Sequence, residues 1–203
     1  MKTRNLYYYV VIKRTNLIKL AFLNFFLAIC SWPRVFIETF TRKSFGERYF
    51  LLALNMFLAA VLAAIPFLKS SFYGSSWGVI TSNATWYFYL IAFLITTLKR
   101  ANEVKREPGV FDKRKFTLSP GIINPWFYRL SLNGKRPSTR TVSVYFEPGV
   151  ALITGLILIS LQQPIGILIA ICSVIYSISW AAQFYLGDQF IMDNIVAIMI
   201  GRT

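Results

Sequence analysis

The feature that most constrains this chain is a set of long apolar runs that carry almost no charge. Residues 49–68 form the clearest run, with no charged side chain and with Asn55 as their only strongly polar group. A helix of that length matches the roughly 30 Å thickness of the hydrocarbon core of a bilayer. Because a soluble domain does not need several such runs, the sequence predicts an all-α integral membrane protein.

About four transmembrane helices are expected, at 49–68, 77–98, 149–161 and 165–186. They pair into two helical hairpins, one within 49–98 and one within 147–186. The piece 149–161 is short for a span, so it either crosses a locally thinned bilayer or re-enters on the same side. We favour crossing, because Gln162-Gln163-Pro164 suits the tip of a hairpin.

Two further segments are amphipathic. Residues 15–33 are apolar but interrupted by Lys19 and Asn24, and Pro33 is expected to end them. We interpret this segment as an interfacial helix, with a true span as the alternative. The tail 187–203 predicts a short amphipathic helix.

The positions of the basic residues predict the orientation. Nine Lys and Arg residues lie in 1–48, one at Lys69, eleven in 99–146 and one at Arg202. With four spans, all the basic residues except Lys69 lie on one side of the membrane, which is the positive-inside pattern. Both termini and the 99–146 loop are therefore expected to be cytoplasmic, and a bacterial inner (plasma) membrane is the expected location.

The loop 99–146 is the longest polar segment of the chain. Strand-like runs at 126–132 and 139–146 flank Asn133-Gly134, which predicts a small cytoplasmic β-hairpin. Its cations are expected to bind anionic lipid or a protein partner, and nucleic acid is the less favoured alternative. These candidate binding residues are Lys113, Arg114, Lys115, Arg129, Lys135, Arg136 and Arg140.

Other candidate sites are few. Small residues on the first span, Ala59, Ala60, Ala63 and Ala64, could permit close helix packing. Cys30 and Cys172 lie in apolar runs and are expected to be buried, and the chain has no His. The central parts of the predicted spans carry no ionisable residue, which argues against a proton-coupled pump. We expect no catalytic residue, no metal and no cofactor.

These observations predict a non-catalytic structural or scaffold subunit of a multi-protein membrane assembly, of a secretion or conjugation type. Its helices would pack against other subunits, and its basic loop would dock a cytoplasmic partner such as an ATPase. The alternative is an oligomeric channel, small transporter or holin-like pore.

Overall fold

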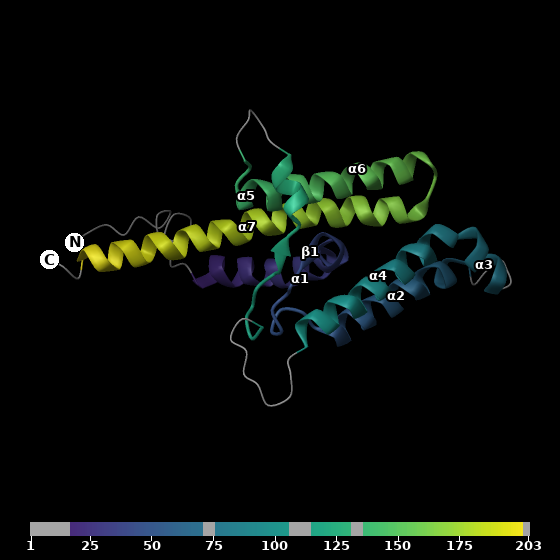
Figure 1. Ribbon diagram of the computed structural model, residues 1–203, viewed down its shortest axis with the longest axis horizontal. Coiled ribbons are helices and arrows are strands. Elements are labelled where there is room, and N and C mark those ends of the chain that lie inside the picture. Colours follow the sequence, from purple (N-terminus) through teal and green to yellow (C-terminus); the bar gives the residue numbers. More distant parts are fainter. Residues whose placement is uncertain (1–16, 71–75, 106–114, 131–135, 201–203) are drawn as a thin grey trace.

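The computed structural model describes residues 17–70, 76–105, 115–130 and 136–200, which are mostly helical (Figure 1). The longer helices are α1 (Leu17–Thr41), α2 (Leu52–Ser70), α4 (Ala84–Val104), α6 (Glu147–Ser160) and α7 (Pro164–Ile200). The short elements are β1 (Arg42–Lys43), α3 (Ser76–Ser82), β2 (Ile122–Ile123), η2 (Pro125–Arg129), α5 (Thr139–Thr141) and η3 (Val142–Phe146).

Within the described residues, three helices are long and apolar enough to cross a membrane. They are Ile18–Thr41, Thr139–Ser160 and Pro164–Met192, while the apolar part of α2, Leu52–Leu68, is shorter. The prediction of a helical chain built from long apolar helices is therefore confirmed. The segment expected to be too short at 149–161 gains length because its helix begins at Thr139 and continues through α5, η3 and α6.

Two helical hairpins make up most of the fold. α6 and α7 are joined by a turn at 161–163, in which Gln162 adopts a φ of 56°. α2 and α4 form the second hairpin, with α3 near its tip. Figure 1 shows that both hairpins turn at the same end of the molecule.

The α6–α7 hairpin depends on two glycines that face each other. A Cβ atom on Gly166 would lie 2.7 Å from the carbonyl oxygen of Gly155 and 2.7 Å from the backbone nitrogen of Ile159. A side chain at Gly155 would meet the backbone nitrogen of Ala170 at 2.9 Å. The two helices therefore approach as closely as small-residue contacts in membrane helices allow.

Pro33 does not end the first helix, as the sequence predicted, but lies inside α1. Figure 1 shows α1 bent, with its second part seen nearly end-on. Proline removes one backbone hydrogen bond and bends a helix. The helix continues to Thr41 because the residues after Pro33 are held by tertiary contacts with α7.

The predicted β-hairpin is wrong. Residues 125–129 form the helix η2, which starts where the side chain of Asn124 accepts a hydrogen bond from the backbone of Trp126 at 3.1 Å. Residues 139–146 are helical, and the side chain of Ser138 caps their start. Packing overrides the strand propensity of these β-branched and aromatic residues. Asn133-Gly134 lies outside the described residues.

The described residues instead form one small antiparallel sheet from β1 and β2. Arg42 pairs with Ile123, and Lys43 pairs with Ile122. Since opposite residues share a face, Arg42 and Ile123 point into the protein while Lys43 and Ile122 are exposed.

The tail predicted as a separate amphipathic helix at 187–203 is, as far as Ile200, the last part of α7. At 37 residues, α7 is about 55 Å long. That length exceeds the hydrocarbon core, so α7 extends past the level at which one span ends.

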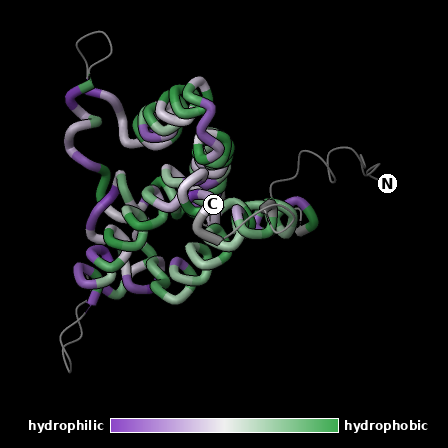
Figure 2. The backbone as a smooth tube through the Cα atoms, turned by 90° about the vertical axis from the view of Figure 1, so that its right-hand side faces the viewer, coloured by the Kyte–Doolittle hydropathy of each residue, from purple (hydrophilic) through white to green (hydrophobic). Residues whose placement is uncertain are grey.

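The main hydrophobic core lies where α1, α2, α4 and α7 meet, and it includes Phe36, Leu62, Trp86, Phe93 and Tyr176. Figure 2 shows that hydrophobic residues also colour much of the helices, while hydrophilic residues are more frequent on the connecting segments. Apolar residues on the outside of helices are what a lipid environment favours.

Candidate functional site: a buried ion network

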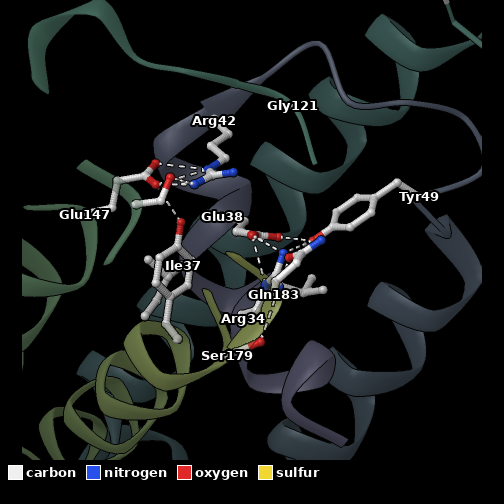
Figure 3. Close-up of polar contacts among 12 residues, drawn as sticks. Arg34, Ile37, Glu38, Arg42, Tyr49, Gly121, Glu147, Ser179 and Gln183 are labelled. Carbon is white, nitrogen blue, oxygen red and sulfur yellow. Dashed lines mark hydrogen bonds and ion pairs between the residues drawn. The ribbon is translucent and has the colours of Figure 1, made fainter. Parts of the chain in front are cut away.

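Three charged side chains follow one another along one side of the chain, from α1 into β1. Arg34, Glu38 and Arg42 are four residues apart, a spacing that places side chains on one helix face. Their exposed fractions are 4%, 1% and 1%, and that of Glu147 at the start of α6 is 0%. Figure 3 shows these four residues brought together with polar groups of α7 and the 44–51 loop.

The first half of the network joins Arg42 to Glu147. The Nε atom of Arg42 donates to both carboxylate oxygens of Glu147 at 3.1 Å, and its Nη2 atom donates to Oε2. The same Nη2 atom donates to the Ser143 hydroxyl at 2.9 Å. Tyr176 of α7 is a second donor to Glu147, through its hydroxyl at 2.7 Å. Glu147 is thus tied to β1 and α7 at once.

The second half joins Arg34 to Glu38 within α1. The Nε atom of Arg34 donates to Glu38 at 3.0 Å, and its Nη1 atom donates to Ser179 at 3.2 Å and to Gln183 at 2.9 Å. Its Nη2 atom donates to the Tyr49 hydroxyl at 2.7 Å. α1 is therefore fixed to α7 and to the loop before α2.

Tyr49 links the two charges of this half. Its hydroxyl accepts from Arg34 and donates to Glu38 at 2.5 Å. Because its hydroxyl donates to the Glu38 carboxylate, Tyr49 takes part in this network as the protonated phenol.

Trp180 of α7 contacts both arginines. The guanidinium carbons of Arg34 and Arg42 lie 4.4 Å and 4.3 Å from its ring centroid. Contacts of this length are favourable cation–π interactions, and they are stronger away from water. The apolar body of Trp180 thus helps to keep two like charges in one buried site.

The network holds two arginines and two glutamates, so its charges balance. Taking such ions out of water is costly, and the cost is offset only when most of their donors and acceptors are satisfied. Each carboxylate here accepts hydrogen bonds from an arginine and from a tyrosine. Carboxylates held in this way suit a structural role better than proton transfer.

The sequence reasoning missed this site. It counted Arg34 and Arg42 among the cytoplasmic cations, and it found no ionisable residue in the central parts of the predicted spans. Arg34 and Glu38 lie within a helix long and apolar enough to cross a membrane, and Glu147 lies within another. The four-residue spacing of opposite charges after an apolar run was the signal that could have found them.

Of the predicted basic residues, Lys115, Arg129, Arg136 and Arg140 lie in the part of the chain that the structure describes. Lys113, Arg114 and Lys135 lie outside the described residues. Lys115 donates to the backbone oxygen of Lys105 at 3.0 Å, and Arg129 and Arg136 are exposed. Arg140 instead pairs with Asp188 of α7 at 2.8 Å and lies over the ring of Phe184.

The start of the segment 115–130 is attached through backbone hydrogen bonds to the loop between β1 and α2. Gly46 donates to Ser119 at 3.0 Å, and Glu47 donates to Lys115 at 2.7 Å. A Cβ atom on Gly46 would lie 2.1 Å from the carbonyl oxygen of Thr117, so only glycine fits there. The exposed side chains of this segment include Leu118, Ile122 and Trp126, at 60%, 64% and 49% of full exposure.

The predicted alanines of α2 differ in their surroundings. Ala59 is buried and Ala63 is half-buried, but Ala60 and Ala64 are exposed. The α4 side chains Trp86 and Tyr87 donate to backbone oxygens of Leu62 and Ala63, at 2.9 Å and 3.2 Å. Cys30 and Cys172 are free and buried, as the sequence predicted.

Among the described residues, no group of three or more His, Cys, Asp or Glu side chains lies close enough to hold a metal ion. The chain matches no protein-family model, and neither a curated protein nor a solved structure matches it.

Proposed function

We propose that this chain is a non-catalytic integral-membrane subunit of a multi-protein assembly, and that it docks a cytoplasmic partner through the segment 115–130. The proposal rests on one observation above all: this segment presents large apolar side chains and cations together on a backbone that is fixed to the helices. We call the exposed residues Lys43, Leu118, Ile122, Trp126 and Arg129 the docking face.

The composition of the docking face supports a protein partner. Exposed apolar groups rimmed by charge are typical of surfaces that bind proteins or membranes. Tryptophan and arginine are also the residues that contribute most often to the binding energy of interfaces. An acidic surface that contains an apolar pocket would complement Lys43, Arg129 and Trp126.

The ion network supports the same proposal, because it makes the docking face rigid. Arg42 belongs to β1, whose backbone pairs with β2, and its side chain holds Glu147 of α6. Binding to a pre-ordered surface costs less conformational entropy than binding to a mobile loop. The network would therefore fix the bound partner in a defined position relative to the helices.

The proposed orientation places the docking face in the cytoplasm. If the tip of the α6–α7 hairpin lies at the far membrane boundary, Gln183 is about 28 Å along α7 from Pro164. The ion network then lies just inside the near edge of the roughly 30 Å hydrocarbon core. The docking face follows on the side where most basic residues lie, in agreement with the positive-inside pattern.

Affinity purification of the tagged full chain from its native membranes in mild detergent tests this function. We expect other proteins at fixed stoichiometry, lost when Trp126→Ala is combined with Arg129→Glu. Lys99→Glu is the matched control, because it reverses an exposed charge on α4 outside the docking face. A homo-oligomer without other subunits that conducts ions in liposomes would overturn the proposal in favour of a pore.

A further inference from the structure

A cavity of about 700 Å³ lies among α1, α4, α6 and α7. Its walls are mostly apolar and include Phe36, Phe40, Phe88, Ala92, Ala151 and Leu158. We call this cavity the groove. Its volume falls within the range of pockets that bind small molecules.

The few polar groups of the groove are already satisfied. Thr154 donates its hydroxyl to the backbone oxygen of Val150 at 2.9 Å, and Thr85 donates to Gln163 at 2.6 Å. Glu147 lines one end, but its carboxylate is occupied by Arg42 and Tyr176. Water needs several polar partners in such a space. The groove therefore favours an apolar occupant.

The length of the groove suits a slender apolar occupant. From Glu147 to Leu158 its wall on α6 is about 16 Å long, at 1.5 Å per residue. An extended hydrocarbon chain can lie along such a wall because it has no polar group to satisfy, whereas an extended peptide would leave its backbone donors and acceptors unpaired there.

The two ends of the groove indicate from which side the occupant enters. Glu147 and Thr41 lie at the end next to the ion network, where the second part of α1 adds to the wall. Thr85 and Ile165 lie at the other end, close to the tips of the two hairpins. A chain in the groove would therefore run from the hairpin tips toward the ion network.

We propose that the groove is a binding site for one acyl chain of a phospholipid from the membrane leaflet at the hairpin tips. An unfilled apolar space in a bilayer would lose dispersion contacts on all its walls, and lipid is the apolar molecule present at high concentration there. The proposal rests on the membrane insertion that forms part of the proposed function.

Photo-crosslinking tests the site. The full chain is reconstituted in phosphatidylcholine vesicles that contain a phosphatidylcholine with a diazirine on one acyl chain, and labelled residues are mapped by mass spectrometry. We expect groove residues such as Ala92 and Ala151 to be labelled several-fold more than Ile153 and Ile157, which are exposed on α6 outside the groove.

Ala151→Trp fills the groove and should lower its labelling several-fold, whereas Ile153→Trp adds the same side chain outside it and should not. If Ala151→Trp does not fold, native mass measurement of the unmodified chain replaces it, with one phospholipid retained through detergent exchange as the expected result. Equal labelling of groove and outer face, or retention of no lipid, would overturn the proposal. Crosslinks between two copies at the groove would overturn it too, while absence of label from every helix would show that membrane insertion itself fails.

Discussion

Arg42 connects two parts of the molecule that are far apart in the sequence. Its backbone pairs with Ile123, and its side chain binds Glu147 in the α5–η3–α6 helix. Arginine stays protonated in proteins, so Arg42 brings a permanent positive charge to this buried site. The position of β1, and with it the docking face, therefore depends in part on this side chain.

Glu147→Gln should show this dependence. Removal of one partner leaves the other as an uncompensated buried charge, which costs about 3–5 kcal/mol of stability. Thermal unfolding in detergent measures the loss. Asp188→Asn is the matched control, because the ion pair of Asp188 with Arg140 has both side chains 55% exposed, and exposed pairs contribute about 0–1 kcal/mol.

A double replacement, Arg42→Met with Glu147→Leu, separates charge from packing. Since apolar residues of similar volume often replace a buried ion pair without loss, the double variant should be more stable than Glu147→Gln. Equal or greater loss in the double variant would mean that the hydrogen bonds to Ser143 and Tyr176, and not the unpaired charge, dominate.

At the scale of elements, the sequence predicts the apolar helices well and their ends poorly. The run at 165–186 appears within α7 because an apolar run of span length has no other stable structure in lipid. The end expected at Pro33 and the strands expected around Asn133 are wrong because packing against other elements decided them. Arg34, for example, is held by Ser179 of α7, a contact across 145 residues that no local pattern contains.

The sequence reasoning proposed close packing at the alanines of α2 and did not identify the contact between Gly155 and Gly166. The alanines of α2 were predicted to pack against another helix because four of them are close together, yet two of them are exposed. A close helix approach is instead found between Gly155 and Gly166, which lie on opposite sides of a turn. A small residue predicts a helix–helix contact only when the partner helix is known.

Gly166→Ala should therefore loosen the α6–α7 hairpin. The added methyl group meets backbone atoms of α6 that cannot rotate away, and overpacking of this kind costs about 1–3 kcal/mol. Gly149→Ala is the matched control, because no atom lies within 4 Å of its added Cβ. There the better helix propensity of alanine should stabilise by about 1 kcal/mol. Equal thermal shifts for the two variants would contradict the close contact.

At the scale of the whole molecule, the arrangement of the hairpins favours the interfacial interpretation of the first helix. Lys19 near the start of α1 donates to Tyr185 of α7 at 3.1 Å. Tyr185 is about 32 Å along α7 from Pro164, which is beyond the hydrocarbon core when the hairpin tip lies at the far boundary. The first part of α1 would then lie along the near surface and not cross beside the hairpins.

Cysteine labelling in sealed vesicles decides between these topologies. Cysteines introduced one at a time at Ile18, Ser82, Arg129 and Gln162 are treated with a membrane-impermeant maleimide, and the unsubstituted chain is the control because its own cysteines are buried. Ser82→Cys and Gln162→Cys should react from one side, since both lie at the hairpin tips (Figure 1). Arg129→Cys should react only from the other side, together with Ile18→Cys if α1 is interfacial. Labelling of Ile18→Cys from the same side as the two hairpin-tip variants would instead show that α1 is a span. The ion network would then join a crossing helix to the hairpins. Labelling of Gln162→Cys and Arg129→Cys from the same side would mean that the α6–α7 hairpin does not cross the membrane. The orientation proposed for the docking face would then be wrong.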